Sequence, residues 1–162
     1  MRCEAMYRHL CHAGLIIVAS LLLWGCAPAK GPFLIVQMCL GNKEGVAELI
    51  EELKAIAAAE KMSFTDRSSD TARELEATGY SSPERAGGSP VINIGLIGKD
   101  GLGIGAGNLG LPGYQVAVGF SGNSNQDESD EFANRVVKRL EQHWHITVVP
   151  AGMGAKPMAG CQ

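Results

Sequence analysis

The chain has 162 residues, of which 46% are hydrophobic and 19% charged, so its composition fits one globular domain and excludes a disordered chain. The 14 basic and 17 acidic side chains give a net charge of −3, which leaves no basic field to attract phosphates. Removing residues 1 to 25 would take away two arginines and one glutamate and leave 12 basic and 16 acidic side chains, or −4. Nucleic-acid binding is therefore not expected.

The first predicted element is a short apolar segment after a weakly basic start. Arg2 and Arg8 precede an uncharged run of twelve residues from Ala13 to Trp24. At about 1.5 Å per residue, twelve residues of helix span about 18 Å, which is short for a bilayer core of about 30 Å but suits an export signal. We therefore expect residues 1 to 25 to be a signal peptide that is removed on export.

The end of this segment, Leu23-Trp24-Gly25-Cys26, resembles the lipobox of bacterial lipoproteins, with a leucine three places before a cysteine and a small residue directly before it. The resemblance implies that Cys26 becomes the mature N-terminus and carries a diacylglyceryl thioether, usually with an added amide-linked chain such as palmitate. More than one acyl chain would anchor the protein in a lipid bilayer. Ala27, where an aspartate would imply inner-membrane retention, favours the outer membrane, facing the periplasm. An uncleaved anchor or an ordinary signal peptide is the alternative.

The rest of the chain divides into three parts. Residues 26 to 32 form a short lipidated tether, residues 33 to 150 a single α+β domain, and residues 151 to 162 a tail rich in glycine and alanine. The six residues from Ala27 to Pro32 reach at most about 20 Å, so the domain is expected close to the lipid surface.

The first part of the domain has the pattern of a β-α-β unit. Phe33 to Leu40 is apolar on both faces apart from Gln37, which predicts a strand in the middle of a sheet. Asn42 can cap a helix that continues to about Lys61, and Ser63 to Arg67 predicts a short strand. Apolar residues recur along this helix at the spacing of one buried face: Val46, Leu49, Ile50, Leu53, Ile56 and Ala57.

The middle of the domain combines a short helix with two alternating strands. Ser68 to Gly79 predicts a surface helix, and Tyr80 to Pro90 is a polar connector rich in proline, glycine and serine. Val91 to Ile97 and Tyr114 to Phe120 alternate apolar and small or polar residues. These two strands are expected to pair with each other.

The domain is expected to end with a second amphipathic helix and a strand. Asp127 and Glu128 suit the first turn of this helix, whose apolar stripe continues to Trp144, and His145 to Val149 predicts the last strand. The predicted fold class is α+β, a ferredoxin-like split βαβ sandwich with two main helices on one face of a mainly antiparallel sheet and a short helical insertion.

The cysteines suggest one disulfide. Five are present, but Cys3 and Cys11 leave with the signal peptide and Cys26 is acylated, so Cys39 and Cys161 remain. In an oxidising periplasm this pair is a candidate disulfide, which would stabilise the fold by up to about 4 to 5 kcal/mol. A buried free thiol at Cys39 with a disordered Cys161 is the alternative.

The glycine-rich segment from Gly98 to Gly113 is the most unusual local feature. Gly105 to Gly110 matches GxGxxG, but a strand and not a helix follows, so the phosphate-binding geometry is missing and no cofactor is expected. A long hairpin loop or an irregular strand edge is the first interpretation. The second is a partner-binding loop, with Lys99, Asp100 and Asn108 as its polar contacts.

No catalytic, cofactor-binding or metal residue is assigned. Ser121 lies in a segment that misses the nucleophile-elbow pattern by one position, and His143 and His145 have no third metal ligand at a characteristic spacing. We therefore expect a non-enzymatic, membrane-anchored envelope lipoprotein that binds another envelope protein as an assembly, regulatory or inhibitor module. The alternative is a small-ligand binder or an undetected hydrolase built around the Gly98 to Gly113 loop and Ser121.

Overall fold

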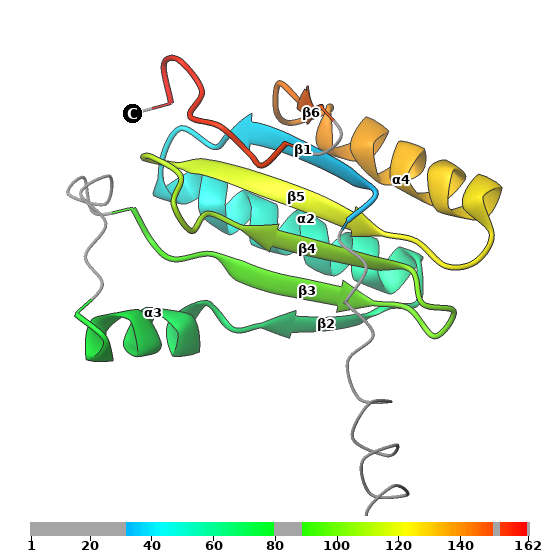
Figure 1. Cartoon of the computed structure of the whole chain (residues 1–162), viewed down its shortest axis with the longest axis horizontal. Coiled ribbons are helices and arrows are strands. Elements are labelled where there is room, and N and C mark those ends of the chain that lie inside the picture. Colours follow the sequence, from blue (N-terminus) through cyan, green and yellow to red (C-terminus); the bar gives the residue numbers. More distant parts are fainter. Residues whose placement is uncertain (1–31, 80–88, 151–152, 162) are drawn as a thin grey trace, which may run out of the picture. The chain divides into compact units, whose positions relative to one another are not determined.

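The structure is a computed structural model and describes residues 32–79, 89–150 and 153–161. Within these residues the chain forms one six-stranded antiparallel sheet and three helices, which confirms the predicted α+β class (Figure 1). The predicted signal peptide, Cys26, the tether up to residue 31 and residues 80–88 of the predicted connector lie outside the described residues. The elements in chain order are β1 Leu34–Cys39, α2 Lys43–Ala59, β2 Ser63–Asp66, α3 Ser68–Ala77, β3 Asn93–Ile97, β4 Gly103–Gly107, β5 Gln115–Ser121, α4 Gln126–Leu140 and β6 Thr147–Val149.

The strand order in the sheet is β2-β3-β4-β5-β1-β6, and every neighbouring pair is antiparallel. The expectation that β3 and β5 pair directly is therefore wrong, because β4 lies between them and pairs with both. β1 is an interior strand, as its apolar sequence predicts, but it lies next to the edge strand β6 and not in the middle. The sequence from Gly98 to Gly113 is thus not one long loop, since its central residues form β4.

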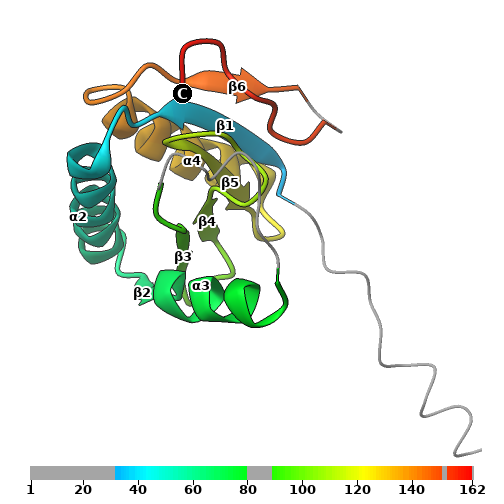
Figure 2. The ribbon, with the colours of Figure 1, turned by 90° about the vertical axis from the view of Figure 1, so that its left-hand side faces the viewer.

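Helices α2 and α4 cover the same face of the sheet (Figure 2). The Asn42 side chain caps α2 by accepting a hydrogen bond of 2.9 Å from the backbone amide of Gly45, and Asn125 caps α4 in the same way through the amide of Glu128. Each helix buries residues that recur at helical spacing, so one stripe of each faces the sheet. Acid-base pairs also join α2 and its C-cap residue Glu60 to α4 and the turn after it. Glu52 pairs with Arg139 and Glu60 with Arg135, and Glu48 pairs with His143 in that turn.

The core lies between these helices and the inner face of the sheet. Alternate residues of each central strand point inward and are buried, which follows from the period of two along a strand. Phe120 of β5 and Phe132 of α4 pack edge to face with their ring centres 6.3 Å apart. The other inward strand residues are Val36, Met38, Ile94, Leu96, Ile104, Ala106, Val116 and Val118.

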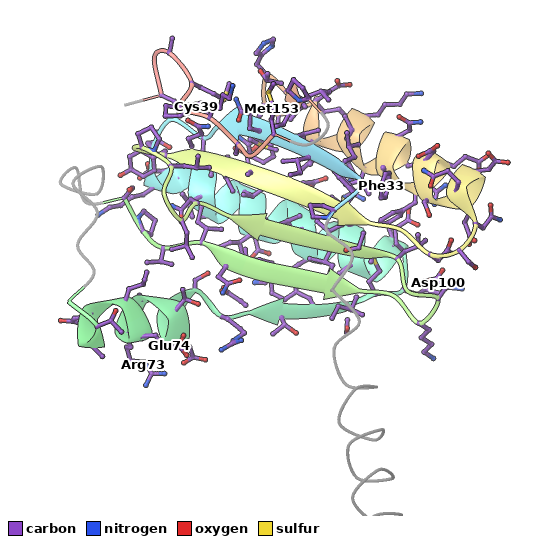
Figure 3. All side chains as sticks on the ribbon, viewed as in Figure 1. Phe33, Cys39, Arg73, Glu74, Asp100 and Met153 are labelled. Atoms are coloured by element: carbon purple, nitrogen blue, oxygen red, sulfur yellow. A yellow bond between two sulfur atoms is a disulfide. The ribbon has the colours of Figure 1, made fainter. Side chains whose placement is uncertain are left out.

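The outer face of the sheet carries the C-terminal tail across β1 and β5. Cys39 and Cys161 form a disulfide, as the cysteine count predicted, and Figure 3 shows Cys39 beside the tail. The backbone amide of Lys156 donates a hydrogen bond of 3.0 Å to the side-chain oxygen of Gln37. The side chain of Gln115 bonds to two further tail groups. Residues 153–161 are therefore fixed on the sheet and are not a loose tail.

Helix α3 is attached near the edge of the sheet that β2 and β3 form, far from the tail. Its N-terminal residue Ser68 accepts a hydrogen bond of 3.0 Å from the backbone amide of Asn93, and Thr71 accepts one of 2.7 Å from the Asn93 side chain. α3 therefore attaches to the start of β3, consistent with the predicted short surface helix.

Several predicted ends of helices and strands shift by a few residues. The shift is largest at α4, which ends at Leu140 and leaves Trp144 buried in the following turn.

Candidate functional site

The turn between β3 and β4 presents two of the three residues predicted to contact a partner. Lys99 and Asp100 are both exposed, and Figure 3 shows Asp100 at the tip of this turn. The turn is closed by a hydrogen bond of 2.9 Å from the amide of Gly98 to the carbonyl of Leu102. Gly101 has a φ of +89°, a conformation that side chains rarely adopt, so glycine is required there. The backbone thus holds the two charged side chains at the end of the hairpin.

A cleft of about 410 Å³ lies beside this turn, between the end of α2 and the start of α4. We call it the turn cleft. Its apolar residues are Met62, Leu102 and Phe132, and its charged residues are three of each sign. Because the charges of the cleft balance and its base is apolar, it suits a partner surface that carries both charged and apolar groups. It does not favour a ligand that is simply an anion or a cation. The charged residues are Glu60, Lys61, Lys99, Asp100, Glu128 and Arg135.

Arg135 and Glu60 form a two-pronged ion pair at one side of the turn cleft. Arg135 donates hydrogen bonds of 3.3 Å from Nε and 3.0 Å from Nη2 to the two carboxylate oxygens of Glu60. This hydrogen bonding to Glu60 raises the pKa of the Arg135 guanidinium above its usual value. Lys61 and Lys99 form no ion pair with another described residue, so they are the cations of the cleft that a partner can engage.

Asn108, the third predicted contact residue, is buried and stabilises the fold through hydrogen bonds to the backbone. Its side chain is 2% exposed, its oxygen accepts a hydrogen bond of 2.8 Å from the amide of Ile92, and its nitrogen donates one of 2.8 Å to the carbonyl of Pro90. The prediction that Asn108 belongs to the same contact surface as Lys99 and Asp100 therefore does not hold. The amide instead fixes the chain where it enters β3.

The residues considered for chemistry do not come together. Ser121 is exposed at the end of β5, and no histidine or carboxylate of the described residues hydrogen-bonds to it. His143 Nδ1 lies 2.7 Å from Glu48 Oε1, so this histidine pairs with α2 and not with His145. In residues 32–79, 89–150 and 153–161, no group of three or more histidine, cysteine, aspartate or glutamate side chains could hold a metal ion.

A second hollow, of about 430 Å³, lies on the outer face of the sheet, and sequence reasoning missed it. We call it the outer-face depression. Gly107, Ala117 and Gly119 lie in its base, in β4 and β5. Glycine and alanine do not produce the alternation of large apolar and polar residues that marks a buried strand face. The only available signal was that small residues recur at every second position along the strands, which places them on one face. The other lining residues are Pro32, Ile35, Ile92, Asn93, Leu109, Gly110, Leu111 and Ala155.

None of the helices in the described parts of the chain is both long enough and apolar enough to span a membrane. A comparison of the sequence with protein-family models and with curated proteins finds no match.

Proposed function

We propose that this chain is a lipoprotein of a bacterial envelope, anchored through acylated Cys26 and facing the periplasm, whose small α+β domain binds another envelope protein without catalysing a reaction. The proposal combines the lipobox resemblance of residues 23 to 26 with the cysteine chemistry and the surface of the domain.

The observation that carries the proposal is the disulfide between Cys39 and Cys161. Disulfides persist in oxidising compartments such as the periplasm and are rare in the cytosol of mesophiles. The bond joins the two cysteines that remain once the signal peptide and Cys26 are set aside. The domain therefore has the covalent structure expected of an exported protein.

The turn cleft is the surface that we propose for the partner. Lys99 and Asp100 project at its edge, and Lys61 adds a second cation without an ion-pair partner among the described residues. Met62, which is half-buried, supplies apolar contact area, while Phe132 and Leu102 are buried beneath the cleft. Interfaces of this kind combine an apolar centre with a polar rim. Asn108 is not part of this proposal, because its amide is buried and bonded.

We also propose that the domain is an elaborated ferredoxin-like fold. β5 and β6 are parallel, since each is antiparallel to β1 between them, and α4 connects them as a split βαβ unit. β1 and β2 are also parallel and are connected by α2, but β5, β4 and β3 separate them in the sheet. The β3–β4 hairpin would then be an insertion into the simplest version of this fold.

A small-molecule ligand in the turn cleft is the second candidate function. The volume of about 410 Å³ lies within the range of ligand sites, and the apolar base with charged groups around it fits an amphipathic molecule. A molecule retained by the purified protein in native mass spectrometry would favour this candidate over a protein partner.

The first test determines the mass of the N-terminal peptide of the protein purified from membranes. The proposal predicts a chain that begins at Cys26 with attached acyl groups, and a Cys26→Ala variant that carries none. A chain that begins at Met1 and remains in the cytosolic fraction would contradict the proposal.

The second test captures partners by cross-linking in intact envelopes. Replacing Lys99 and Asp100 together with alanine should reduce recovery of the main cross-linked protein. The control replaces Lys43 and Glu44, a neighbouring exposed lysine and acid at the opposite end of α2, and should leave recovery unchanged. Equal recovery in both double variants would exclude the turn cleft as the contact surface.

A further inference from the structure

Helix α2 ends in a backbone conformation that favours glycine, but the residue there is Lys61. Its φ is +56°, and it is the only residue other than glycine with a positive φ in the described parts of the chain. The turn is closed by a hydrogen bond of 2.8 Å from the amide of Met62 to the carbonyl of Ala57. This is a common way to end a helix, and glycine is the usual residue at the left-handed position because a side chain is strained there.

Helix α3 also ends with a left-handed residue, and there the residue is glycine. Gly79 has a φ of +67° and follows the C-cap residue Thr78, just as Lys61 follows the C-cap residue Glu60. The two helices thus end alike, and only α2 carries a side chain at the strained position. Glycine would relieve the strain at Lys61. A strained residue at the edge of a cleft points to a function of its side chain.

Lys61 and Lys99 both line the turn cleft. Ser63 of β2 pairs with Ile97 of β3, and each lysine lies two residues beyond this pair, on the same side of it. Both lysines are exposed, and neither forms an ion pair with another described residue. Because neighbouring cations repel each other, a negative group between them would be attracted by both.

The three acids of the turn cleft are engaged within the fold. Glu60 belongs to the two-pronged ion pair, and Glu128 Oε2 accepts a hydrogen bond of 2.9 Å from the side-chain nitrogen of Asn123. Asp100 Oδ1 accepts a hydrogen bond of 3.4 Å from the amide of Leu102, within its own turn. Among the described residues, the charges of the cleft that have no partner are therefore the two lysines, although the chain as a whole is negative.

We propose that the turn cleft takes an acidic segment of the partner protein, with carboxylates at Lys61 and Lys99 and an apolar side chain on Met62, an inference that rests on the proposed function. Met62 is half-buried, and the other apolar side chains of the lining, Phe132 and Leu102, are buried. The cleft can therefore cover one apolar side chain but not a long hydrocarbon tail, which favours a peptide over a lipid. Lys61 supplies the second cation, which explains a side chain at the strained position.

The test uses the full chain, purified from membranes in detergent, and a short synthetic peptide in which photoreactive benzoylphenylalanine is flanked by aspartates. After irradiation, this acidic peptide should cross-link to the tryptic fragment that contains Met62. The control peptide carries lysines in place of the aspartates and should cross-link little there. Octanoate, a small amphipathic carboxylate, should not compete, and full competition by octanoate would overturn the choice of a peptide.

Lys61→Gly separates the strain at this position from the charge. It should raise the melting temperature by about 2 to 4 °C, because the strain is relieved. It should also reduce cross-linking of the acidic peptide by about two- to fivefold, as expected for the loss of one exposed ion pair. Lys61→Arg keeps the charge and should keep the cross-linking.

The matched control is Gly79→Lys, which places the same strain and charge at the end of α3, at a position that does not line the cleft. It should lower the melting temperature and leave the cross-linking unchanged. A lower melting temperature in Lys61→Gly would show that the lysine stabilises the end of α2 through its charge, and it would overturn the inference.

Three results of the cross-linking would overturn the inference as well: no cross-link from either peptide, equal cross-linking of the acidic and basic peptides, or equal cross-linking of Lys61→Gly and the wild-type protein. The proposal that the domain binds an envelope protein would then be decided separately, by the capture of a partner in intact envelopes.

Discussion

The side-chain amide of Gln115 donates a hydrogen bond of 2.6 Å to the backbone carbonyl of Lys156, 41 residues further along the chain. The oxygen of the same side chain accepts a hydrogen bond of 2.8 Å from the backbone amide of Met158. Gln115 has no exposed surface, and both bonds lie in partly buried surroundings. The side chain of Gln115 thus bonds to the backbone of the tail at two points, as a neighbouring strand would do with its own backbone.

Replacing Gln115 with alanine should loosen the tail. The change leaves the carbonyl of Lys156 and the amide of Met158 without partners, at a cost of about 1 to 3 kcal/mol for each group that stays buried. Hydrogen exchange should become faster at the amide of Met158. Exchange at the amide of Lys156, which bonds to Gln37, should change less, and the reverse pattern would contradict this assignment.

Removal of the disulfide should destabilise the domain strongly. Cys39 and Cys161 are 122 residues apart, and closing a loop of that length stabilises a fold by about 4 to 5 kcal/mol in the chain-entropy model. Replacing both cysteines with serine should lower the free energy of unfolding in urea by about that amount, and reduction of the wild-type protein should have a similar effect. Alkylation of both thiols in the unreduced native protein would contradict the bond.

Asn108→Ala should reduce stability without a direct effect on the turn cleft. It removes the two hydrogen bonds that hold Pro90 and Ile92, and each unpaired buried group costs about 1 to 3 kcal/mol. Lys99→Ala, at an exposed position, should change the free energy of unfolding by less than about 0.5 kcal/mol. Comparison of the two urea midpoints checks this difference, and equal midpoints would show that Asn108 is not a structural residue.

Gly45→Ala should destabilise the protein although alanine favours helices. A side chain at Gly45 would lie 2.1 Å from the carbonyl oxygen of Leu40, and forcing such contacts costs about 1 to 3 kcal/mol, more than the gain in helix propensity of about 1 kcal/mol. The control Gly105→Ala meets nothing within 4 Å and should be neutral or stabilising by about 0.5 to 1 kcal/mol. Thermal unfolding of both variants would reveal opposite shifts, and a stabilising Gly45→Ala would contradict the packing at Leu40.

The sequence was sufficient where large side chains repeat with a clear period. Helix α2 shows its buried face through residues such as Leu49, Leu53 and Ile56, and β3 through the alternation of Ile94 and Leu96. Counting cysteines left Cys39 and Cys161 as a candidate pair with a free thiol as the alternative, and the fold decides between them by bringing the two ends of the chain together. The α+β class was therefore accessible, since most of its core is built from such residues.

The rest depended on contacts that no local pattern encodes. β4 has the sequence Gly-Ile-Gly-Ala-Gly, which carries few side chains to show a face, and its pairing with β3 and β5 separates two strands that were expected to be neighbours. Asn108 looks like a loop residue in the sequence, and its burial arises from backbone groups 16 to 18 residues earlier. Both hollows likewise combine segments far apart in the chain.

The bond between Cys39 and Cys161 also makes most of the domain a closed covalent ring. A protease that hydrolyses a single peptide bond anywhere between these two cysteines opens the ring but releases no fragment. Under oxidising conditions the nicked molecule keeps its original mass, apart from one added water, and its pieces separate on a gel only after reduction. The N-terminal segment before Cys39 would stay joined to both pieces, so one such cut would not detach the domain from an anchor at Cys26.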